Sequence, residues 1–440
     1  MKPTNWVDLT DLSIWTGHHT GIQRVVYNIA KQYAAHNNAK FFVYDEKHRV
    51  FEEVDFAIIN TPKAPPKSSW KKNLKKRVKK SSISIYSSIP YESRQKITPK
   101  LKPIARFFYH KSHHAVHLAK QTQAGLKRKK HFIPVDFKEN DRVIILGAGW
   151  VRPKILNDLY NLKQTNKFKI FHFIHDVIPI HNPHLFGPGH FELFTKYIFD
   201  VASVCDGIIT NSKYSREDYL KYCREQSLPL LPVDVIRLGD ELEMNPEQEP
   251  VQGLEPKSFI LAVGTIEIRK NYSLLYTAYK LAIEKGIKLP RLVIVGRPGW
   301  NAGDTVYAIE NDASVDGKIK ILKSVDDAAL AWLYSNCLFT VYPSIYEGWG
   351  LPIAESMVHG KLCITSKTSS MPEVAGDLAA YFSPYDTAEC LDVIKSYLDE
   401  GKLKLAEKKI KAGYKVQLWS DTYMNFEEAV EKQISFMDAQ

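Results

Sequence analysis

Short apolar runs alternate along the chain with segments in which apolar residues recur every three or four positions. The first pattern is typical of strands that are buried on both faces, and the second is typical of amphipathic helices. Regular alternation of the two predicts an α/β protein with doubly wound parallel sheets. The strands that we expect cover residues 6–9, 41–44, 57–59, 141–146, 169–174, 206–210, 233–238, 259–263, 291–295, 319–322 and 337–342.

A polar and proline-rich segment, residues 243–250, interrupts this alternation near the middle of the chain. The chain has 440 residues, which is long for one hydrophobic core and sufficient for two α/β domains. We therefore predict an N-terminal domain over residues 1–245 and a second domain that begins at residue 246. A last helix with apolar spacing is expected from about residue 421 to residue 437.

The stretch Y-P-S-I-Y-E-G-W-G-L-P-I-A-E, residues 342–355, follows an apolar run and precedes a predicted helix. Pro352 suits the first position of that helix, and Gly360 suits its end. A loop between a parallel strand and a helix lies at the carboxyl end of the strand, where open α/β sheets bind ligands. The N–H groups of a helix N-terminus attract anions, and Gly348 and Gly350 let the backbone approach one closely. This stretch therefore predicts a phosphate site.

Two carboxylates flank the predicted phosphate site. Glu347 lies in the loop, and Glu355 lies in the first helical turn, eight positions later. Because carboxylates are good acceptors for sugar hydroxyls, the arrangement suggests a ligand with phosphates in the middle and a sugar at each end, as in a nucleotide sugar. The alternative is a pair of solvated side chains, in which the helical glutamate interacts with the helix dipole.

The pattern E-x7-E from Glu347 to Glu355, with the local sequence E-G-W-G-L-P-x-A-E, resembles the family 4 retaining glycosyltransferases of the GT-B fold. This resemblance implies two doubly wound, Rossmann-like domains that face each other across a cleft. It implies that the nucleotide-sugar domain covers residues 246–417 and that the C-terminal helix, residues 418–440, packs back onto the acceptor-binding first domain. It also implies that Glu347 contacts the transferred sugar and that Glu355 contacts the ribose.

Two further segments match motifs of the same family. Arg269 and Lys270, in R-K-N after a buried strand, match the basic residues that hold the donor diphosphate. His175 and Asp176, in H-D-x-I-P at the end of another strand, match the acceptor-side motif. There His175 would contact the sugar near the reacting carbon, and Asp176 would orient the histidine or the acceptor. The alternatives are exposed loop charges and a histidine that is satisfied within the core.

The resemblance implies that the other donor contacts come mainly from the backbone. Gly21, in the first glycine-bearing loop, would face the diphosphate across the cleft, although a plain strand-to-helix turn explains this glycine equally well. Val325, in S-V-x-D, would lie beside the nucleotide base. The donor-binding amides of the central stretch would be those of Gly348, Trp349, Gly350 and Leu351.

The net charge of +11 is concentrated in one basic insertion, at about residues 62–131. Between Lys63 and His131 there are 20 Lys and Arg and one acid, Glu92, which gives a local charge of 20 − 1 = +19 and leaves 11 − 19 = −8 for the remainder. A solvated segment is the first interpretation of such a block. Attachment to an anionic membrane surface is the second, and its aromatic residues fit an interface better than a base-stacking groove. We therefore expect no nucleic-acid partner.

Other features limit the location and the chemistry. The sequence has no apolar run of about 18 residues, and Asp8 and Asp11 stand where a signal peptide needs its apolar core. We therefore expect a cytoplasmic protein. Peripheral attachment to the inner face of the plasma membrane is the alternative. The five cysteines are scattered and never form C-x-x-C, which predicts reduced core thiols and no structural zinc.

The predicted reaction is transfer of a hexosyl group from a nucleoside-diphosphate sugar to a hydroxyl, with retention of configuration. Charge that develops on the leaving diphosphate must be stabilised. Because the sequence contains no D-x-D, we expect Arg269, Lys270, the loop amides and the helix dipole to do this without a metal ion, and we expect no cofactor. GDP-mannose is the first expected donor, and dTDP-rhamnose or a UDP-sugar is the second, because pocket shape sets the choice of sugar.

The acceptor is expected to be a glycan or a lipid-linked glycan of a bacterial surface polysaccharide, which is typical of relatives with the opening T-G-I-x-R-V. Two alternatives belong to other classes of protein: a nucleotide-sugar-binding protein without catalysis, and a membrane-surface or nucleic-acid scaffold led by the basic insertion. A GT-B phosphorylase or epimerase is the alternative among enzymes.

Overall fold

The computed structural model of the chain describes residues 3–15, 21–60, 133–241 and 249–439. Within these residues the named strands form two mainly parallel sheets, in which helices connect the parallel strands and a short turn connects the antiparallel pair β2 and β3. Parallel pairing needs long crossover connections, which these helices supply. The predicted α/β class with two doubly wound sheets is therefore confirmed.

The first sheet has seven strands in the order β3-β2-β1-β4-β5-β6-β7. Strand β1 lies between β2 and β4 and pairs with both in parallel, whereas β3 pairs with β2 in the antiparallel sense. The strands are β1 (Asn5–Asp8), β2 (Ala39–Asp45), β3 (Val50–Val54), β4 (Arg142–Ile145), β5 (Lys169–Ile174), β6 (Gly207–Thr210) and β7 (Val233–Val235).

One predicted strand of this sheet is wrong. Residues 57–59 do not form a strand but lie in a 3₁₀ helix, Phe56–Asn60. The backbone N–H of Ala57 donates to the side chain of Asp55 at 2.7 Å, which turns the chain at the start of this helix. In this sheet the sequence pattern missed β3, in which buried Val50 and Phe51 precede half-buried Glu52 and Glu53.

The helix at the C-terminal end of the described chain packs on the first sheet. It is α17 (Trp419–Asp438), which confirms the predicted helix from about residue 421 to residue 437. The ring of Phe426 lies 6.4 Å from that of Phe173 in β5, and the side-chain amide of Gln433 donates to the backbone oxygen of Ile208 in β6 at 2.9 Å. The other helices of this part are α1 (Thr10–Ile14), α2 (Ile22–Ala35), α6 (Pro153–Asn166), α7 (Ile178–His181), α8 (His190–Val204) and α9 (Lys213–Glu225).

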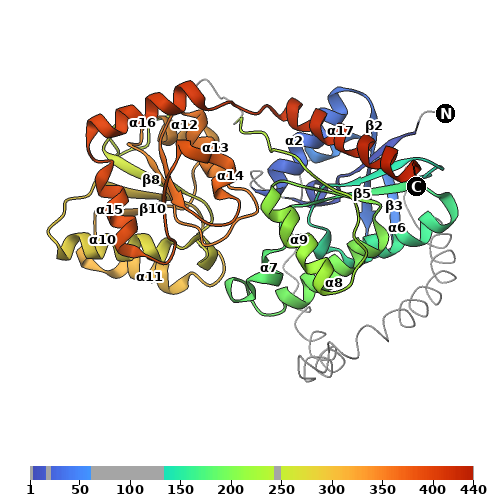
Figure 1. Cartoon of the computed structure of the whole chain (residues 1–440), viewed down its shortest axis with the longest axis horizontal. Helices are drawn as coiled ribbons and strands as arrows, with labels where there is room; N and C mark the ends of the chain where they lie inside the picture. Colours follow the sequence, from blue (N-terminus) through green and yellow to red (C-terminus); the bar gives the residue numbers. More distant parts are fainter. Residues whose placement is uncertain (1–2, 16–20, 61–132, 242–248, 440) are drawn as a thin grey trace. The chain divides into compact units, whose positions relative to one another are not determined.

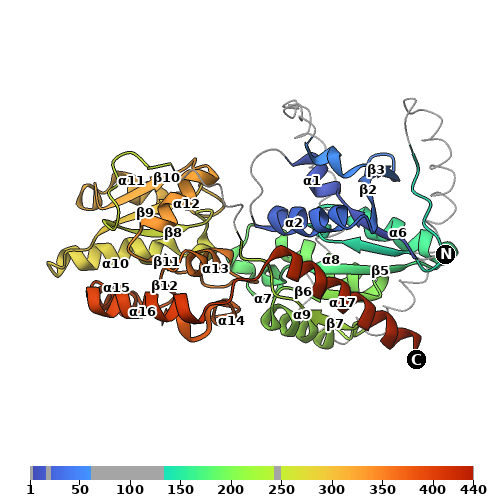
Figure 2. The same cartoon turned by 90° about the horizontal axis from the view of Figure 1, so that it is seen from above.

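The second sheet has six strands in the order β10-β9-β8-β11-β12-β13, which is the order of a dinucleotide-binding fold. Figure 2 shows β10, β9, β8, β11 and β12 one after another in this order. The strands are β8 (Phe259–Val263), β9 (Arg291–Val295), β10 (Ile319–Leu322), β11 (Thr340–Tyr342), β12 (Cys363–Ser366) and β13 (Ala380–Phe382).

Helices cover both faces of the second sheet. In Figure 1, α10 and α11 lie on one side of it, and α12 and α13 lie on the other. The core under α12 includes Phe259, whose ring stacks on that of Trp332 at 6.1 Å. The helices are α10 (Tyr272–Glu284), α11 (Gly303–Asn311), α12 (Asp327–Asn336), α13 (Leu351–Val358), α14 (Met371–Ala375), α15 (Thr387–Ser396) and α16 (Glu400–Gly413).

The described residues group into two compact units. Unit 1 contains the described residues of Met1–Phe171 together with Asp200–Asp206 and Cys223–Pro229. Unit 2 contains those of His172–Phe199, Gly207–Tyr222 and Leu230–Gln440. Gly21 belongs to unit 1, and all other predicted site residues belong to unit 2. The predicted domain boundary at residues 245 and 246 stays a prediction.

Three further expectations have different outcomes. All five cysteines are free and buried, as predicted. Among the described residues, no helix has both the length and the apolar character that crossing a membrane requires. The basic insertion at residues 62–131, with its predicted membrane contact, lies outside the described residues.

Candidate functional site

The loop after β8 is built so that it brings two cations to the carboxyl end of the sheet. Gly264 follows the buried strand with φ +144°, a conformation that favours glycine. Gly296, at the end of the neighbouring β9, lies so close that a Cβ there would overlap the backbone oxygen of Gly264. These two glycines let the loops after β8 and β9 pack together. A short 3₁₀ helix, Ile268–Lys270, then presents Arg269 and Lys270.

The loop after β11 is bound directly to this 3₁₀ helix. The backbone N–H of Ile345 donates to the backbone oxygen of Arg269 at 2.9 Å, and the Arg269 guanidinium donates to the backbone oxygen of Tyr346 at 2.8 Å. Ser370 holds the other side of the loop, because its hydroxyl lies 2.8 Å from the backbone oxygens of both Glu347 and Trp349 and can donate to either. The predicted central stretch is therefore fixed by its neighbours.

Glu347, Arg269 and Lys270 form one ion cluster. The Glu347 carboxylate pairs with the Arg269 guanidinium through one oxygen and with the Lys270 ammonium through the other, at 2.7 Å. Arg269 also pairs with Glu267 at 2.7 Å, and Lys270 donates to the hydroxyl of Tyr342 at 2.5 Å. The structure thus brings together three residues that the sequence predicted to share a donor site, and it adds two others.

The charges in this cluster decide the protonation of Glu347. Burial alone raises the pKa of a carboxyl group, but the positive charges of Arg269 and Lys270 outweigh burial and lower the pKa of Glu347 to about 2. Glu347 is therefore ionised at neutral pH. A buried carboxylate held by two cations is a strong hydrogen-bond acceptor, as a contact to sugar hydroxyls requires.

The other members of the cluster respond to burial and to each other. Burial opposes the charge of Arg269, yet the carboxylates of Glu347 and Glu267 raise the pKa of its guanidinium. Burial lowers the pKa of Lys270, and the charge of Glu347 only partly offsets that effect. Burial raises the pKa of Glu267, against the lowering effect of Arg269. Two cations thus stand against two carboxyl groups, which leaves the cluster close to neutral.

Helix α13 starts next to the cluster, as predicted. Gly350 is its N-cap with φ +132°, and Leu351 is its first residue, followed by Pro352. The N–H groups at a helix N-terminus suit an anion. Here Pro352 has no N–H, and the N–H groups of Ile353 and Ala354 donate to the backbone oxygen of Gly350 at 2.9 and 3.4 Å, so the predicted anion contact falls to the amides before them, up to Leu351. Glu355 is buried in this helix, where its carboxylate accepts the hydroxyl of Tyr334 at 2.6 Å. Its predicted contact with a ribose stays a prediction.

The glycine at position 348 has a structural reason that the sequence did not reveal. A Cβ there would overlap the backbone oxygen of His175 and approach the Cβ of Asp176 to 2.9 Å. The absent side chain therefore allows contact with the H-D-x-I-P segment, in addition to the predicted approach of an anion. The hydroxyl of Ser215 joins the same segments, because it lies 3.2 Å from the backbone oxygen of Gly348 and 3.3 Å from that of His175.

His175 and Asp176 lie beside the central loop, as expected for parts of one site. The imidazole of His175 is buried and packs against the ring of Phe173 at 4.8 Å. Burial raises the pKa of Asp176, and the charge of Arg269 opposes this rise. Asp176 also accepts the backbone N–H of Ile178 at 3.1 Å. The roles of His175 and Asp176 with an acceptor stay predictions.

Three other predicted site residues are placed by their local structure. Gly21 is the N-cap of α2 with φ +53°, which confirms a glycine turn before a helix. Val325 is half-buried and packs against the core cluster that contains Leu333. The side chain of Trp349 is buried. Contacts of all three with a donor stay predictions.

Comparison with known proteins bears on this geometry. Residues 244–416 match the family described as glycosyl transferases group 1. The predicted family resemblance is confirmed. The matched segment contains the second sheet and the complete ion cluster, so the cluster is a feature of the group 1 segment of the chain.

One curated relative and two solved structures give the scale of the similarity. The O-antigen chain mannosyltransferase B of Escherichia coli is 31% identical over 205 residues, which are 45% of this chain and 53% of the relative. The chain thus spans about half the length of this relative. Sucrose-phosphate synthase from Thermosynechococcus elongatus has a TM-score of 0.60 at 16% identity, over 99% of this chain and 100% of that chain. HepE from Anabaena, in complex with UDP, has a TM-score of 0.56 at 14% identity, over 98% and 100%. These neighbours establish the GT-B fold.

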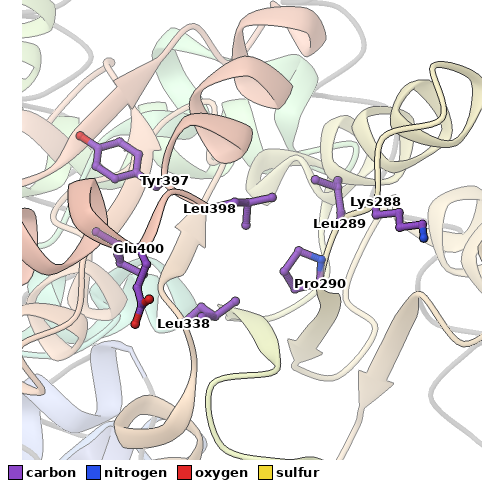
Figure 3. Close-up of a pocket in the computed structure, with 8 residues that line it drawn as sticks. Lys288, Leu289, Pro290, Leu338, Tyr397, Leu398 and Glu400 are labelled. Atoms are coloured by element: carbon purple, nitrogen blue, oxygen red, sulfur yellow. The ribbon is translucent and has the colours of Figure 1, made fainter.

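A pocket of about 370 Å³ lies elsewhere in the group 1 segment. Leu289 and Pro290 precede β9, and Leu338 precedes β11, so the pocket lies at the amino ends of these strands. Figure 3 shows these side chains facing that of Leu398. Because its lining is mainly apolar and the ion cluster is at the opposite ends of the strands, this pocket is not the candidate site.

Sequence reasoning missed Glu267 and Tyr342, which both contact the cations of the group 1 segment. Glu267 stands two residues before Arg269, in the loop at the carboxyl end of a predicted strand. Because open α/β sheets bind ligands at such ends, this position marks Glu267 as a candidate site residue. Tyr342 ends a buried strand and carries no comparable signal, because strand tyrosines mostly pack.

Proposed function

We propose that this chain is a hexosyltransferase that moves a sugar from a nucleoside-diphosphate sugar to a hydroxyl group, with retention of configuration. The observation that carries the proposal is the cluster of Glu347, Arg269 and Lys270 at the carboxyl end of a parallel sheet, in the segment that matches glycosyl transferases group 1. Two cations next to a helix N-terminus suit a diphosphate, and an ionised carboxylate suits sugar hydroxyls.

In this proposal each charged group has its own part of the donor. Arg269, Lys270 and the first amides of α13 bind the diphosphate, and Glu347 accepts hydroxyls of the transferred sugar. Glu355 binds the ribose, and Val325 and Gly21 contribute the backbone contacts to the base and the diphosphate. The GT-B fold, which this chain shares with structures that cover nearly all of it, supports such a donor domain.

The bond changes follow from these positions. The bond between the sugar C1 and the β-phosphate oxygen breaks, and the nucleoside diphosphate leaves with the electron pair. The acceptor oxygen forms a bond to C1 on the same face, and its proton passes to the leaving phosphate oxygen. Arg269 and Lys270 stabilise the charge that develops on this phosphate. His175 contacts the sugar near C1, and Asp176 orients it or the acceptor.

The proposed donor is GDP-mannose. The support is the 31% identity to the O-antigen chain mannosyltransferase B over 45% of this chain. Incubation with GDP-mannose, dTDP-rhamnose and a panel of UDP-sugars, with detection of the released nucleotide, tests this choice. Release from dTDP-rhamnose or a UDP-sugar alone would replace the donor, and binding without release for every donor would indicate a non-catalytic binder.

Retention and metal independence need separate measurements. The anomeric configuration of the product, compared by NMR with that of the donor, must be unchanged. Turnover must survive exhaustive chelation, because Arg269, Lys270 and the α13 amides stabilise the leaving group in this proposal. A strict requirement for Mg²⁺ or Mn²⁺ would contradict that part of the proposal.

The proposed acceptor is a glycan or lipid-linked glycan in the synthesis of a bacterial surface polysaccharide. The basic insertion fits this acceptor, because an acceptor in a membrane requires the enzyme at the cytoplasmic membrane surface. The sequence charge of +19 in residues 63–131 supplies attraction to anionic lipid of roughly 1 kcal/mol per basic residue close to the surface. Cytoplasmic location with peripheral membrane attachment is therefore part of the proposal.

Vesicle pelleting tests the membrane attachment. The protein should pellet with anionic vesicles at low salt and be released at about several hundred millimolar salt, because salt reduces the distance over which the charges attract each other. Replacement of seven basic residues by Gln should abolish pelleting but leave transfer to a soluble acceptor intact. The seven are Lys71, Lys72, Lys75, Lys76, Arg77, Lys79 and Lys80. Pelleting of this variant would exclude the proposed attachment.

We also propose the domain division at residues 1–245 and 246–417, with residues 418–440 attached to the first domain. The start of the family match at residue 244 supports it. Residues 246–417 produced alone should unfold cooperatively in urea. A non-cooperative transition would contradict the division.

A further inference from the structure

The ion cluster contains two kinds of contact. Glu347 is shared between the two cations, because each of its oxygens pairs with one of them. Arg269 and Lys270 also have side-chain partners other than Glu347, and Arg269 donates in addition to the backbone oxygen of Tyr346 at 2.8 Å. The guanidinium of Arg269 bonds to the carboxylate of Glu267 at 2.7 Å, and the ammonium of Lys270 bonds to the hydroxyl of Tyr342 at 2.5 Å. Arg269 makes its contact with Glu267 through a different terminal nitrogen from the one that pairs with Glu347, and the Lys270 ammonium serves both of its partners because it has three N–H donors.

A bound donor diphosphate would change only the shared contact. In the proposed function, on which this inference rests, the diphosphate binds Arg269 and Lys270 and the sugar binds Glu347. The diphosphate and the Glu347 carboxylate are both anions, so they compete for the same two cations. Once Glu347 turns to the sugar, each cation would lose its ion pair with that carboxylate. Without other partners, two long and flexible side chains would have to be ordered by the donor itself.

We propose that Glu267 and Tyr342 are positioning residues, which hold Arg269 and Lys270 in place while the donor diphosphate replaces Glu347. This assigns a role in donor recognition to two residues that touch the donor only through the cations. It also explains why Glu347 can leave the cluster without collapse of the site, because each cation keeps at least one polar partner at all stages.

The local structure suits both residues to this role. Glu267 is buried and precedes the 3₁₀ helix that carries both cations, and its backbone oxygen accepts the N–H of Lys270 at 3.0 Å. Tyr342 is the last residue of β11 and is buried in the sheet. The ammonium of Lys270 lies 4.8 Å from the centre of its ring, which adds a cation–π contact to the hydrogen bond. Tyr342 at the end of a strand and Glu267 at the N-cap of a 3₁₀ helix are rigid partners, which orient flexible side chains at little entropic cost.

Conservative variants test the proposal through donor kinetics. Tyr342→Phe removes only the hydroxyl, and we expect kcat/KM for the donor to fall about tenfold or more, because a hydrogen bond to a charged group is lost. Glu267→Ala should cause a similar or larger fall. Glu267→Gln should restore part of it, since the amide oxygen still accepts from Arg269.

Double variants separate positioning from a merely structural role. In an Arg269→Ala background, Glu267→Ala should have no further effect on kcat/KM, and in a Lys270→Met background Tyr342→Phe should have none. A structural role would instead lower the thermal midpoint and reduce activity in both backgrounds. Persistence of the full Glu267 effect without Arg269, or of the full Tyr342 effect without Lys270, would overturn the proposal.

A matched control uses a tyrosine at the opposite end of the same sheet. Tyr279 in α10 is buried, and its hydroxyl donates to the backbone oxygen of Pro290 at 2.8 Å. Tyr279→Phe should leave donor kinetics unchanged. If Tyr342→Phe behaves like this control in an active enzyme, the positioning role is wrong. If the wild-type protein neither binds nor turns over any sugar nucleotide, the proposed function itself fails.

Discussion

Two buried carboxylates at the ends of parallel strands behave in opposite ways. Asp8 ends β1 in the first sheet, and Glu347 follows β11 in the second. Burial raises the pKa of Asp8 to about 6, because the hydroxyl and N–H of Thr10 only partly compensate for lost water. The pKa of Glu347 falls to about 2, because the charges of Arg269 and Lys270 outweigh burial.

The difference teaches which feature marks the functional carboxylate. Both side chains are buried, so burial does not distinguish them. Hydrogen bonds from Thr10 are enough to fix the conformation of Asp8, which helps to start helix α1. Glu347 is held instead by ion pairs with Arg269 and Lys270, in a cluster whose charges nearly cancel. Strongly shifted pKa values of this kind gather at functional sites.

The largest expected effect comes from removing the charge of Glu347. Glu347→Gln should reduce turnover by about 100-fold to 1,000-fold, as loss of a preorganised electrostatic contact does. Because two buried cations would lose their shared partner, we expect the free energy of unfolding to fall by about 3–5 kcal/mol. Transfer assays and urea unfolding measure the two effects.

A surface glutamate provides the control for Glu347. Glu310 pairs with Lys323 at 2.7 Å, and both side chains are about half exposed, at 44% and 53%. Glu310→Gln should change stability by less than about 1 kcal/mol and leave turnover unchanged. Equal turnover of Glu347→Gln and wild type would remove Glu347 from the donor site.

The acid dependence of the same variant sharpens the comparison. The folded pKa of Glu347, about 2, lies below its ordinary value of 4.5, so its ion pairs stabilise the protein above pH 4.5 and lose this effect as the pH falls toward 2. The stability gap between wild type and Glu347→Gln should therefore shrink over this window, by up to about 3 kcal/mol. Urea unfolding at a series of pH values measures it, and a gap independent of pH would contradict the ion-pair assignment.

Asp8 should show the opposite dependence. Its folded pKa of about 6 lies above the ordinary value of 3.8, so ionising it in the folded protein costs stability as the pH rises through 6. Asp8→Asn cannot ionise, and it should be more stable than wild type at pH 8 by at most about 3 kcal/mol. The gain should vanish below pH 3.8, the lower end of this window. A gain of equal size at pH 8 and below 3.8 would mean that ionisation is not its cause.

The smallest effect concerns the backbone that carries Glu347. Gly348→Ala should destabilise the protein by about 1–3 kcal/mol, because the new methyl group overlaps the backbone of His175. Gly303, the first residue of α11, has nothing within 4 Å of an added Cβ. Gly303→Ala should therefore be neutral or stabilising by less than about 1 kcal/mol. Thermal unfolding of both variants tests this pair, and similar midpoints would exclude the close approach.

The sequence predicted the positions of strands in the second sheet better than it predicted the contacts of Arg269 and Lys270. Long apolar runs such as 259–263 and 291–295 coincide with β8 and β9, because strands buried on both faces leave a clear pattern. The prediction missed the edge strand β3, of which only one part is buried, and also β12 and β13 of the second sheet, which are only four and three residues long. Motifs located Glu347, Arg269 and Lys270. They did not reveal that these residues are ion-paired, since spacing along a chain does not determine which charges meet in space.

Nucleotide binding tests the central claim most directly. The claim is that Arg269, Lys270 and Glu347 form the site of the donor diphosphate. Dissociation constants for GDP, UDP and dTDP should be measured by calorimetry for the wild type, for Lys270→Met and for Lys361→Met. Lys361 is a buried lysine near the amino ends of β11 and β12, where its ammonium donates to the backbone oxygen of Cys337 at 2.8 Å. For the nucleotide that binds best, Lys270→Met should weaken affinity about tenfold or more, whereas Lys361→Met should match the wild type. Equal affinity of Lys270→Met and wild type would contradict the account.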